Sequence, residues 1–463
     1  MMQKNCQRAA GLPVLQMLLL LLLLLLVWTG TANAQSIEGS DPGVCKAAAY
    51  LEHRLQSLNI PGAALAIAGE NGTVYFRGFG KERSGGKAPG PETPFVIGSL
   101  TKSFTALASM QLVESGKVEL DRPVQTYLPW FDLADSDAAS RITVRHLLNQ
   151  TSGLSQISGM RPLADFSSGP KGTEKIVREL SGFSPERQPG AAYEYSNMNF
   201  NILGLIIEAA SGMEYGNYIE KYIFAPLGME HSHTSKTEAV PDGLAEGHTF
   251  RFGFPKAVPE LPLPAASLPS GQLISSAGDM GEYLAAYING GRSGGPQVLS
   301  PEGMTELLYP AVEAGAMGIE MGDYAMGWFV EDLDGGRMIW HDGTAPDYFA
   351  FMALLPEEKL GMVLLVNGNH MFTNFALLEA AATAAEMLAG GDPETEAQGS
   401  SSWILWLIRG FLLIPVLQLT GILLTIRKLR QRRYLYSGIK PAVFWSVHIF
   451  LASLPHFLLP GFT

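Results

Sequence analysis

The order of strand-like and helical segments predicts an α+β domain whose sheet is completed by strands from both ends of the domain. Two strand-like runs come early, at residues 63–68 and 73–80, on either side of the hairpin turn signal Glu70-Asn71-Gly72. Helical patterns fill the sequence that follows. Strand-like runs return late in the chain, at residues 324–331, 337–341, 348–355 and 362–367.

Apolar residues at helical spacing predict the helices in order along the chain. We expect helices at residues 41–56, 104–113, 174–180, 199–210, 215–223, 280–288 and 375–388. Glycine and proline mark breaks between the elements. Residues 80–91 are expected to form a loop, and the proline-rich residues 255–269 a long surface loop.

The composition limits the classes of protein to which the chain can belong. With 463 residues, of which 47% are hydrophobic, the chain can bury a large core. Its formal net charge of -12 argues against a nucleic-acid partner. The sequence has two cysteines, Cys6 in the leader and Cys45 after it, so no disulfide can form within the mature chain.

Residues 1–34 are typical of a secretory signal peptide. Lys4 and Arg8 precede a leucine-rich run, and a small-residue cleavage site follows it at residues 32–34. The alternative is an uncleaved anchor helix, because the leucine run is only a little shorter than the ~20 residues that span a bilayer. Either interpretation exports the domain that follows, residues 35–389.

The C-terminal part of the chain predicts a membrane region. Residues 390–402 are polar and are interpreted as a linker. Residues 403–426 are apolar apart from Arg409 and Gln418, and are long enough to cross a bilayer.

The rest of the membrane region, which extends to residue 463, sets the expected orientation. Basic residues crowd the loop at residues 427–440 and mark it as cytoplasmic. A second apolar segment, residues 442–459, is expected to return across the membrane. The predicted location is therefore the cell membrane, with the main domain outside the cytoplasm.

A serine and a lysine three residues apart form the first candidate for chemistry. Ser99 opens the helical pattern that ends at Ser115-Gly116, so Lys102 would share a helix face with the Ser99 hydroxyl. The positive end of the helix dipole would favour negative charge there. The alternative is a helix N-cap serine beside a solvated lysine. The S-x-x-K pattern occurs elsewhere without a following amphipathic helix, at Ser84, Ser168 and Ser437.

A tyrosine and an asparagine form the second candidate. Tyr195 and Asn197 come out of a Pro-Gly loop and enter a predicted helix, where they would present a phenol and a carboxamide together. Y-x-N also occurs at Tyr215 and Tyr287, but both of these lie within helical patterns and need no special role.

The histidines supply the third candidate. His341 begins the chain's only H-x-G sequence, His341-Asp342-Gly343, which ends one predicted strand just before another. A lone histidine is more often structural. His231 and His233 form the only close histidine pair, and we expect no metal there.

Taken in order, these motifs resemble the serine acyl-enzyme superfamily of penicillin-binding proteins and class C β-lactamases, with its esterase and DD-peptidase relatives. The matches are S-L-T-K at Ser99, Y-S-N at Tyr195, and H-D-G at His341 in place of the family's Lys-Thr-Gly. Supporting similarity includes H-L-L-N-Q-T-S-G-L at His146 and G-Q-L-I-S-S-A-G-D-M at Gly271. The resemblance implies a β-lactamase/transpeptidase-like fold, with an antiparallel sheet flanked by helices and a helical subdomain.

The resemblance also implies a serine hydrolase that works through a covalent acyl-enzyme. Ser99 would attack an acyl carbonyl, with Lys102 as base if burial or a neighbouring cation lowers its pKa from about 10.4. Tyr195 would carry a proton to or from the leaving group. Asn197 would hold the substrate or orient Lys102. No metal or cofactor is required.

The third motif would supply substrate-binding and oxyanion groups, but it departs from the family pattern. The implied oxyanion donors are the N–H groups of Ser99 and Thr344, the latter on the strand entered from Gly343. His341 replaces a permanently charged lysine, and a histidine with a pKa of about 6.5 is mostly neutral at pH 7. We therefore expect weaker carboxylate recognition, and an ester or D-amino-acid amide as substrate rather than an antibiotic. Asp342 is expected to face the opposite side of the strand and to be non-catalytic.

The leading hypothesis is a membrane-anchored serine hydrolase whose partners are a small-molecule or peptidoglycan-type acyl substrate and the lipid bilayer. One alternative is a penicillin-binding-type sensor, in which the acyl-enzyme persists and the membrane segments relay occupancy inward. Another is an inactive relative kept for protein contacts, against which the complete set of motifs argues. The sequence predicts no particular oligomeric state.

Overall fold

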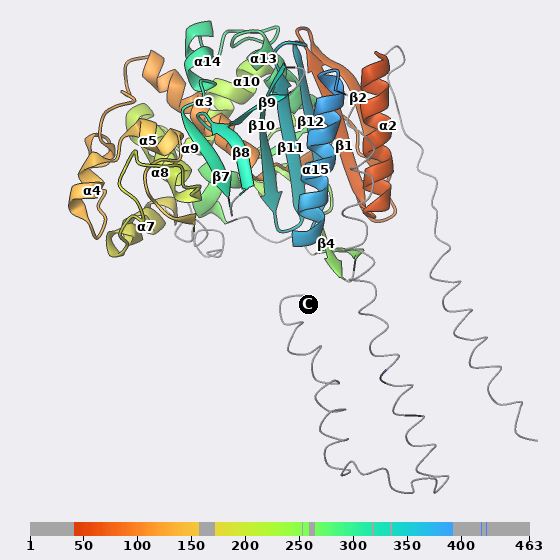
Figure 1. The fold of residues 1–463 in the computed structure, drawn as a ribbon, viewed down its shortest axis with the longest axis horizontal. Coiled ribbons are helices and arrows are strands. Elements are labelled where there is room, and N and C mark those ends of the chain that lie inside the picture. Colours follow the sequence, from red (N-terminus) through yellow and green to blue (C-terminus); the bar gives the residue numbers. More distant parts are fainter. Residues whose placement is uncertain are drawn as a thin grey trace, which may run out of the picture. The chain divides into compact units, whose positions relative to one another are not determined.

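Strands from the two ends of the domain lie side by side in one antiparallel sheet (Figure 1). The computed structural model describes residues 41–156, 172–251, 253–258, 264–316, 319–333, 336–391, 418 and 423. Within these residues the sheet has the spatial order β2-β1-β12-β11-β10-β9-β8-β7. The strand bounds are β1 Gly62–Gly69, β2 Gly72–Gly80, β7 Val312–Ala316, β8 Ile319–Tyr324, β9 Phe329–Leu333, β10 Gly336–Ala345, β11 Tyr348–Leu355 and β12 Leu360–Val366.

The pairing of β1 with β12 joins the early strands to the late ones. Ala63 lies opposite Val366, and Ala68 lies opposite Gly361. The predicted closure of the sheet by both ends of the domain is confirmed. Two smaller sheets contain β13 Gly368–Asn369, β4 His248–Arg251 and β5 Phe254–Ala257, and β3 Pro94–Val96 with β6 Ile274–Ser276.

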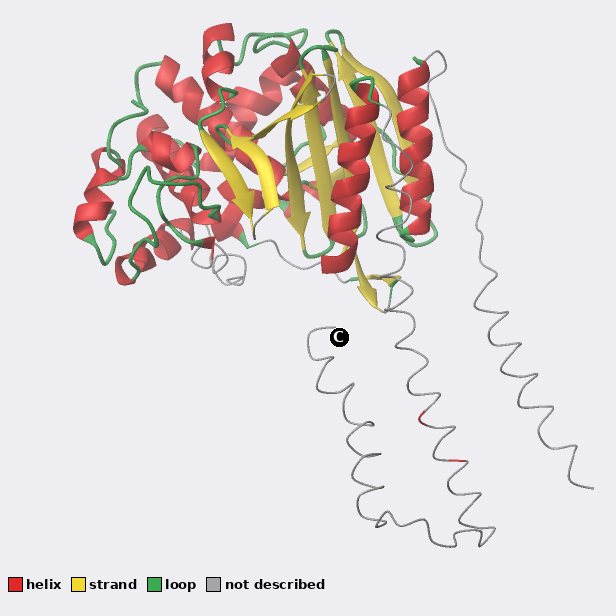
Figure 2. Ribbon diagram, in the orientation of Figure 1, coloured by secondary structure: helices red, strands yellow, loops and turns green. Residues whose placement is uncertain are grey.

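Helices pack on both faces of the large sheet and also gather beside it (Figure 2). Helices α2 and α15 contact one another and lie over one face, whereas α13 packs against β1, β2 and β12 on the other. The helix bounds are α2 Pro42–Ser57, α3 Thr101–Glu114, α4 Ser136–Arg141, α5 Val144–Leu148, α7 Gly172–Arg178, α8 Asn197–Ser211, α9 Tyr215–Ile219, α10 Ala225–Leu227, α11 Lys236–Ala239, α12 Leu268–Gly271, α13 Ala277–Ile288, α14 Pro301–Leu307 and α15 Met371–Leu388.

The sheet separates two apolar cores. Alternating residues of β11 belong to different cores, with Phe351 packed on the side of α2 and α15 and Met352 on the side of α3, α8 and α13. Every residue of β1 and β11 is buried, because both faces of the sheet are covered. Each fully buried side chain of this size contributes about 1.5–3 kcal/mol relative to its exposed state.

Each of the seven predicted helices coincides with a helix of the structure. The prediction of a long surface loop over residues 255–269 is wrong at both ends of that range. Pro255 lies in the edge strand β5, where proline removes no hydrogen bond of the ladder. Pro269 lies in the first turn of the buried helix α12, a position that tolerates proline. Gly204 of α8 provides the space, since a Cβ there would lie 2.3 Å from Pro269 Cγ.

The expectation of one continuous strand over residues 324–331 is also wrong. Tyr324 ends β8, residues 325–328 form a turn, and β9 begins at Phe329. Strands β7 and β8 escaped prediction because they are short and contain glycine and acidic residues, which are depleted in strands.

Within the part of the chain that the structure describes, no helix is both long enough and apolar enough to cross a membrane. The expected signal peptide and the expected membrane segments, residues 403–426 and 442–459, lie outside that part, apart from residues 418 and 423.

Candidate active site

Ser99 lies in a single 3-10 turn, Gly98–Leu100, which leads directly into α3. Strand β10 passes against this turn, and two glycines make the approach possible. Gly98 has a φ of +55°, and a Cβ on it would lie 2.6 Å from Thr344 N. A Cβ on Gly343 would lie 2.0 Å from Ile97 O. The backbone at Thr344 is therefore in close contact with the Ser99 turn, as the expected pair of oxyanion donors requires.

Lys102 is completely buried, with an exposed fraction of 0%, and its amine is surrounded by oxygen atoms. Nζ lies 2.8 Å from Ser99 Oγ, 2.7 Å from Asn197 Oδ1 and 2.6 Å from Ser270 O. Burial lowers the pKa of the Lys102 amine to about 7, against a smaller opposing effect of the Asp342 charge. The alternative of a solvated lysine beside an N-cap serine is thereby excluded.

The three partners of Lys102 determine what its neutral form can do. Asn197 Oδ1 and Ser270 O can only accept hydrogen bonds, so they take the two hydrogens of a neutral amine. The remaining lone pair is then directed at the Ser99 hydroxyl, which has a proton to donate. The geometry therefore provides a base for Ser99 near neutral pH.

Tyr195 approaches the same serine oxygen. Its hydroxyl donates to Ser99 Oγ at 2.9 Å, and its ring lies 4.9 Å from Lys102 Nζ. Burial raises the pKa of the Tyr195 phenol well above its ordinary value of 10. Tyr195 is therefore protonated near neutral pH, so its hydroxyl can donate a proton but cannot accept one as a phenolate.

His341 lies in the middle of β10, so the expectation that it ends a strand is wrong. Its Nδ1 donates to the carbonyl oxygen of Asp342 at 2.5 Å, which leaves Nε2 as an acceptor. Nε2 is buried and has no hydrogen-bond partner among the described residues. Burial, followed by the charge of Lys102, lowers the pKa of the His341 ring to about 3. The ring is therefore neutral, and it packs beside Tyr195, with their centroids 6.3 Å apart.

Asp342 and Thr344 occupy the other face of β10, as strand alternation predicts. Trp340 belongs to the core under α2 and α15, and the Thr344 hydroxyl donates to Asn374 Oδ1 of α15 at 3.2 Å. Burial raises the pKa of the Asp342 carboxyl to about 6. Among the described residues no hydrogen bond joins the Asp342 side chain to Ser99, but its charge raises the pKa of Lys102.

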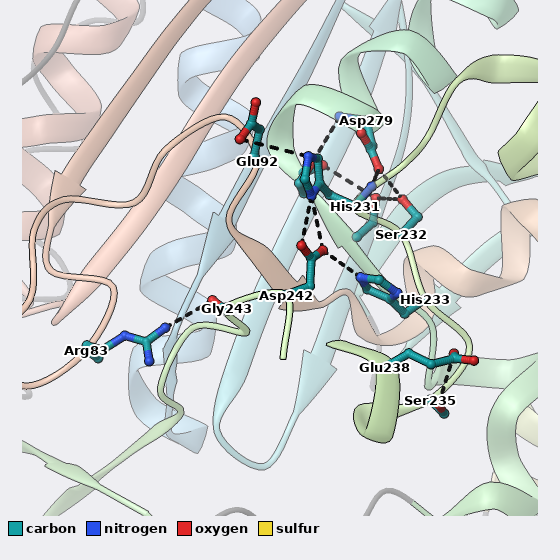
Figure 3. A network of polar contacts seen from close by, with 12 residues as sticks. Arg83, Glu92, His231, Ser232, His233, Ser235, Glu238, Asp242, Gly243 and Asp279 are labelled. Carbon is teal, nitrogen blue, oxygen red and sulfur yellow. Dashed lines mark hydrogen bonds and ion pairs between the residues drawn. The ribbon is translucent and has the colours of Figure 1, made fainter. Parts of the chain in front are cut away.

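The histidine pair at His231 and His233 lies in a separate polar network around Asp242 (Figure 3). His231 Nδ1 is 3.1 Å from both Asp242 oxygens, and His233 Nε2 is 2.7 Å from Oδ2. No cluster of three or more possible ligands in the described ranges is arranged to hold a metal ion. The network joins residues 231–233 to Asp242 and to Asp279 of helix α13.

Sequence reasoning missed the Ser270 carbonyl, which is one of the three partners of Lys102. It is a backbone group on α12, directly after residues 255–269, which were expected to form a surface loop. No side-chain pattern could have identified it. The nearest signal was the following segment Gly271-Gln272-Leu273, which belongs to the family resemblance.

The fold and this cluster define a class of protein in which a buried lysine and a tyrosine contact one serine beside an interior strand of an antiparallel sheet. The family model described as Beta-lactamase matches residues 47–386. The chain belongs to the beta-lactamase family, whose members are generally serine hydrolases.

Several known proteins are similar to the chain over most of this region. Protein flp of Staphylococcus aureus (strain MW2) is 29% identical over 331 residues, which are 69% of this chain and 62% of that protein. Penicillin-binding protein 4 of Amycolatopsis lactamdurans is 28% identical over 69% of this chain and 85% of its own length. The match therefore spans less than two thirds of the flp protein.

A solved structure is similar as well. The octameric penicillin-binding protein homologue from Pyrococcus abyssi has a TM-score of 0.65 and 28% sequence identity, over 76% of this chain and 79% of that one. Its fold agrees with the β-lactamase-like arrangement of an antiparallel sheet and helices that the sequence resemblance implied.

Proposed function

We propose that the protein is a serine hydrolase that acts outside the cytoplasm on an ester, an amide or a D-amino-acid peptide through an acyl-enzyme. One observation carries the proposal. Ser99 Oγ lies between a lysine amine at 2.8 Å and a tyrosine hydroxyl at 2.9 Å. The lysine is buried and has a pKa of about 7, so a large fraction is neutral at neutral pH.

The reaction follows from these two contacts. Ser99 Oγ attacks the acyl carbon while its proton passes to Lys102 Nζ, and the carbonyl oxygen gains the negative charge. The N–H groups of Ser99 and Thr344 stabilise that charge. Tyr195 then donates its proton to the leaving group as the bond to the acyl carbon breaks, and Lys102 returns a proton to the phenol. A water molecule then attacks the acyl carbon of the acyl-enzyme and gives a proton to Lys102. The bond between the acyl carbon and Ser99 Oγ breaks, Lys102 returns that proton to Ser99, and the free acid leaves.

The polarity of His341 supports a substrate without a carboxylate at that position. The ring is neutral and its free Nε2 accepts hydrogen bonds, so it offers a substrate carboxylate neither charge nor donor. The names of two similar proteins refer to penicillin binding. We therefore place the substrate among peptidoglycan-type or small acyl compounds, with esters and D-amino-acid amides preferred to β-lactams.

The proposed location is the cell membrane, supported by sequence patterns. A basic and leucine-rich leader at residues 1–34 precedes the domain, and the apolar segment 403–426 and the basic loop 427–440 follow it. Carbonate extraction of membranes, together with protease treatment of intact cells, tests the proposal. The protein should stay in the membrane fraction and its main domain should be cleaved from outside.

The function is tested with the full chain in detergent. The substrates are p-nitrophenyl esters, D-alanine p-nitroanilide and a chromogenic cephalosporin, and the control is Ser99→Ala. Repeated turnover of an ester or an amide that disappears in Ser99→Ala is the expected result. Stoichiometric labelling of Ser99 without turnover would instead identify a penicillin-binding-type sensor, and absence of labelling an inactive relative.

A further inference from the structure

One buried residue, Gln150, holds the main chain on both sides of Tyr195. Its carbonyl oxygen accepts a hydrogen bond from Glu194 N at 2.8 Å, and its side-chain Oε1 accepts one from Ser196 N at 3.0 Å. Oε1 also accepts from Asn199 Nδ2 at 2.5 Å. The residues directly before and after Tyr195 are thus fixed by a single side chain and its own backbone.

The orientation of this amide follows from its neighbours. The donor at Ser196 is a backbone N–H, so the side-chain atom that faces it is the oxygen. Asn199 uses its own Oδ1 to accept from Ser152 Oγ at 2.6 Å, which leaves its nitrogen for Gln150.

Gln150 also has an unusual backbone. Its φ is +57°, a left-handed conformation that few residues other than glycine adopt, and its exposed fraction is 0%. Glycine would satisfy the backbone more easily, yet it would remove the oxygen that binds Ser196 and Asn199. The position therefore combines a disfavoured conformation with a side chain that makes two hydrogen bonds beneath the site.

We infer that Gln150 is a positioning residue that aims the Tyr195 hydroxyl at Ser99 Oγ. The inference rests on the proposed function. The phenol oxygen stands at the far end of a long side chain, so a small rotation of the backbone at residues 194–196 moves it by much more than the backbone itself. Displacements near 1 Å are enough to cost about a hundredfold in rate.

The choice of leaving group separates this role from simple damage to the fold. A p-nitrophenolate ion leaves without a proton, whereas an aliphatic amine or alcohol needs the proton that Tyr195 supplies. Gln150→Ala in the full chain should lower kcat/KM for a D-alanyl alkylamide about a hundredfold. It should lower kcat/KM for the p-nitrophenyl ester less than threefold. A purely structural defect would reduce both substrates by the same factor.

Two further variants complete the test. Gln150→Glu keeps an oxygen for Ser196 N and Asn199 Nδ2, and should restore amide activity to within tenfold of the unaltered chain. Asn59→Ala is the matched control, because Asn59 also has a left-handed φ of +55° and its side chain binds the remote Gly253 carbonyl. Its ratio of amide to ester activity should not change. Melting temperatures of all three variants are measured alongside.

The outcomes are distinct from those that test the function itself. Absence of turnover by the unaltered chain would contradict the proposed function. Turnover by the unaltered chain, with the same ratio of amide to ester activity in Gln150→Ala, would overturn the positioning role alone. If Gln150→Ala does not fold, Gln150→Glu decides: a ratio lowered as far as in Tyr195→Phe would overturn the inference that the oxygen positions Tyr195, and a retained ratio would support it.

Discussion

Tyr195 and Ser99 are joined by a hydrogen bond of 2.9 Å, in which the phenol donates to the serine oxygen. The two groups that contact Ser99 Oγ, the Tyr195 hydroxyl and the Lys102 amine, differ in how readily they lose a proton. Because burial raises the pKa of Tyr195 and lowers that of Lys102, the phenol holds its proton in the pH range where the amine begins to lose one. We therefore propose Lys102 as the base and Tyr195 as the acid.

Tyr195→Phe should remove the acid and leave the base. We expect kcat/KM for a D-alanyl alkylamide to fall about 100-fold to 10,000-fold, the usual contribution of a general acid. A p-nitrophenyl ester should be affected much less, since its leaving group needs no proton. Steady-state kinetics on both substrates check this, with Tyr193→Phe as control. Equal losses on the two substrates would contradict the assignment.

The pH dependence should report the lysine. Burial lowers the pKa of Lys102 to about 7, and the neutral amine is the active form. The rate constant kcat/KM should therefore rise about tenfold per pH unit below pH 7 and level off above it. Measurement between pH 5 and pH 9 with a neutral ester tests the expectation.

Asp342→Asn should move this profile in a defined direction. The negative charge of Asp342 stabilises the protonated amine and so raises the pKa of Lys102. Without that charge, the pKa of Lys102 falls, and the acid limb of the profile should shift to lower pH. The matched control is Asp332→Asn, which removes a carboxylate from an exposed ion pair with Arg337. A shift to higher pH would refute the electrostatic role of Asp342.

Gly98→Ala should disrupt the oxyanion site. The added Cβ would lie 2.6 Å from Thr344 N, in addition to the strain of a φ of +55°. Loss of one oxyanion donor typically costs about 100-fold to 1000-fold in rate. Gly116→Ala controls for strain alone, because Gly116 has a φ of +68° but open space around it. Only Gly98→Ala should lose activity beyond its effect on the melting temperature.

Substrate polarity at His341 gives a further expectation. A peptide ending in D-alanine amide should be hydrolysed faster than the same peptide with a free carboxylate, because the neutral ring provides no charge for the carboxylate. The ratio of the two kcat/KM values, measured at pH 7.5, decides the question. A preference for the free acid would show that another group binds it.

The sequence was informative where local physics determines structure. Helical spacing identified α3 and α15, and the hairpin signal identified β1 and β2, because these patterns reflect which residues are buried. It failed at β7 and at α12 for opposite reasons. Strand β7 is short and contains Glu313 and Gly315, which are residue types depleted in strands. The prolines around α12 signalled a loop, although Gly204 accommodates Pro269 in the core.

The candidate site also has some residues that the sequence predicted and some features that it could not predict. Ser99, Lys102, Tyr195 and Asn197 stood out by residue type and spacing, and the structure brings them within hydrogen-bonding distance. The Ser270 carbonyl could not be predicted, because a backbone oxygen leaves no trace in residue type. The tautomer of His341 also depends on a contact that only the folded strand reveals.

The partnership of β1 with β12 has a consequence for biosynthesis. During translation, Ser99 and Lys102 are synthesised more than two hundred codons before residues 341–366. Strand β1 therefore cannot pair with β12 until almost the whole domain has been made. Such distant pairings fold slowly. The Ser99 turn therefore meets strand β10 only when the domain is nearly finished, so a chain that stops before residue 336 lacks the strand against which this turn packs.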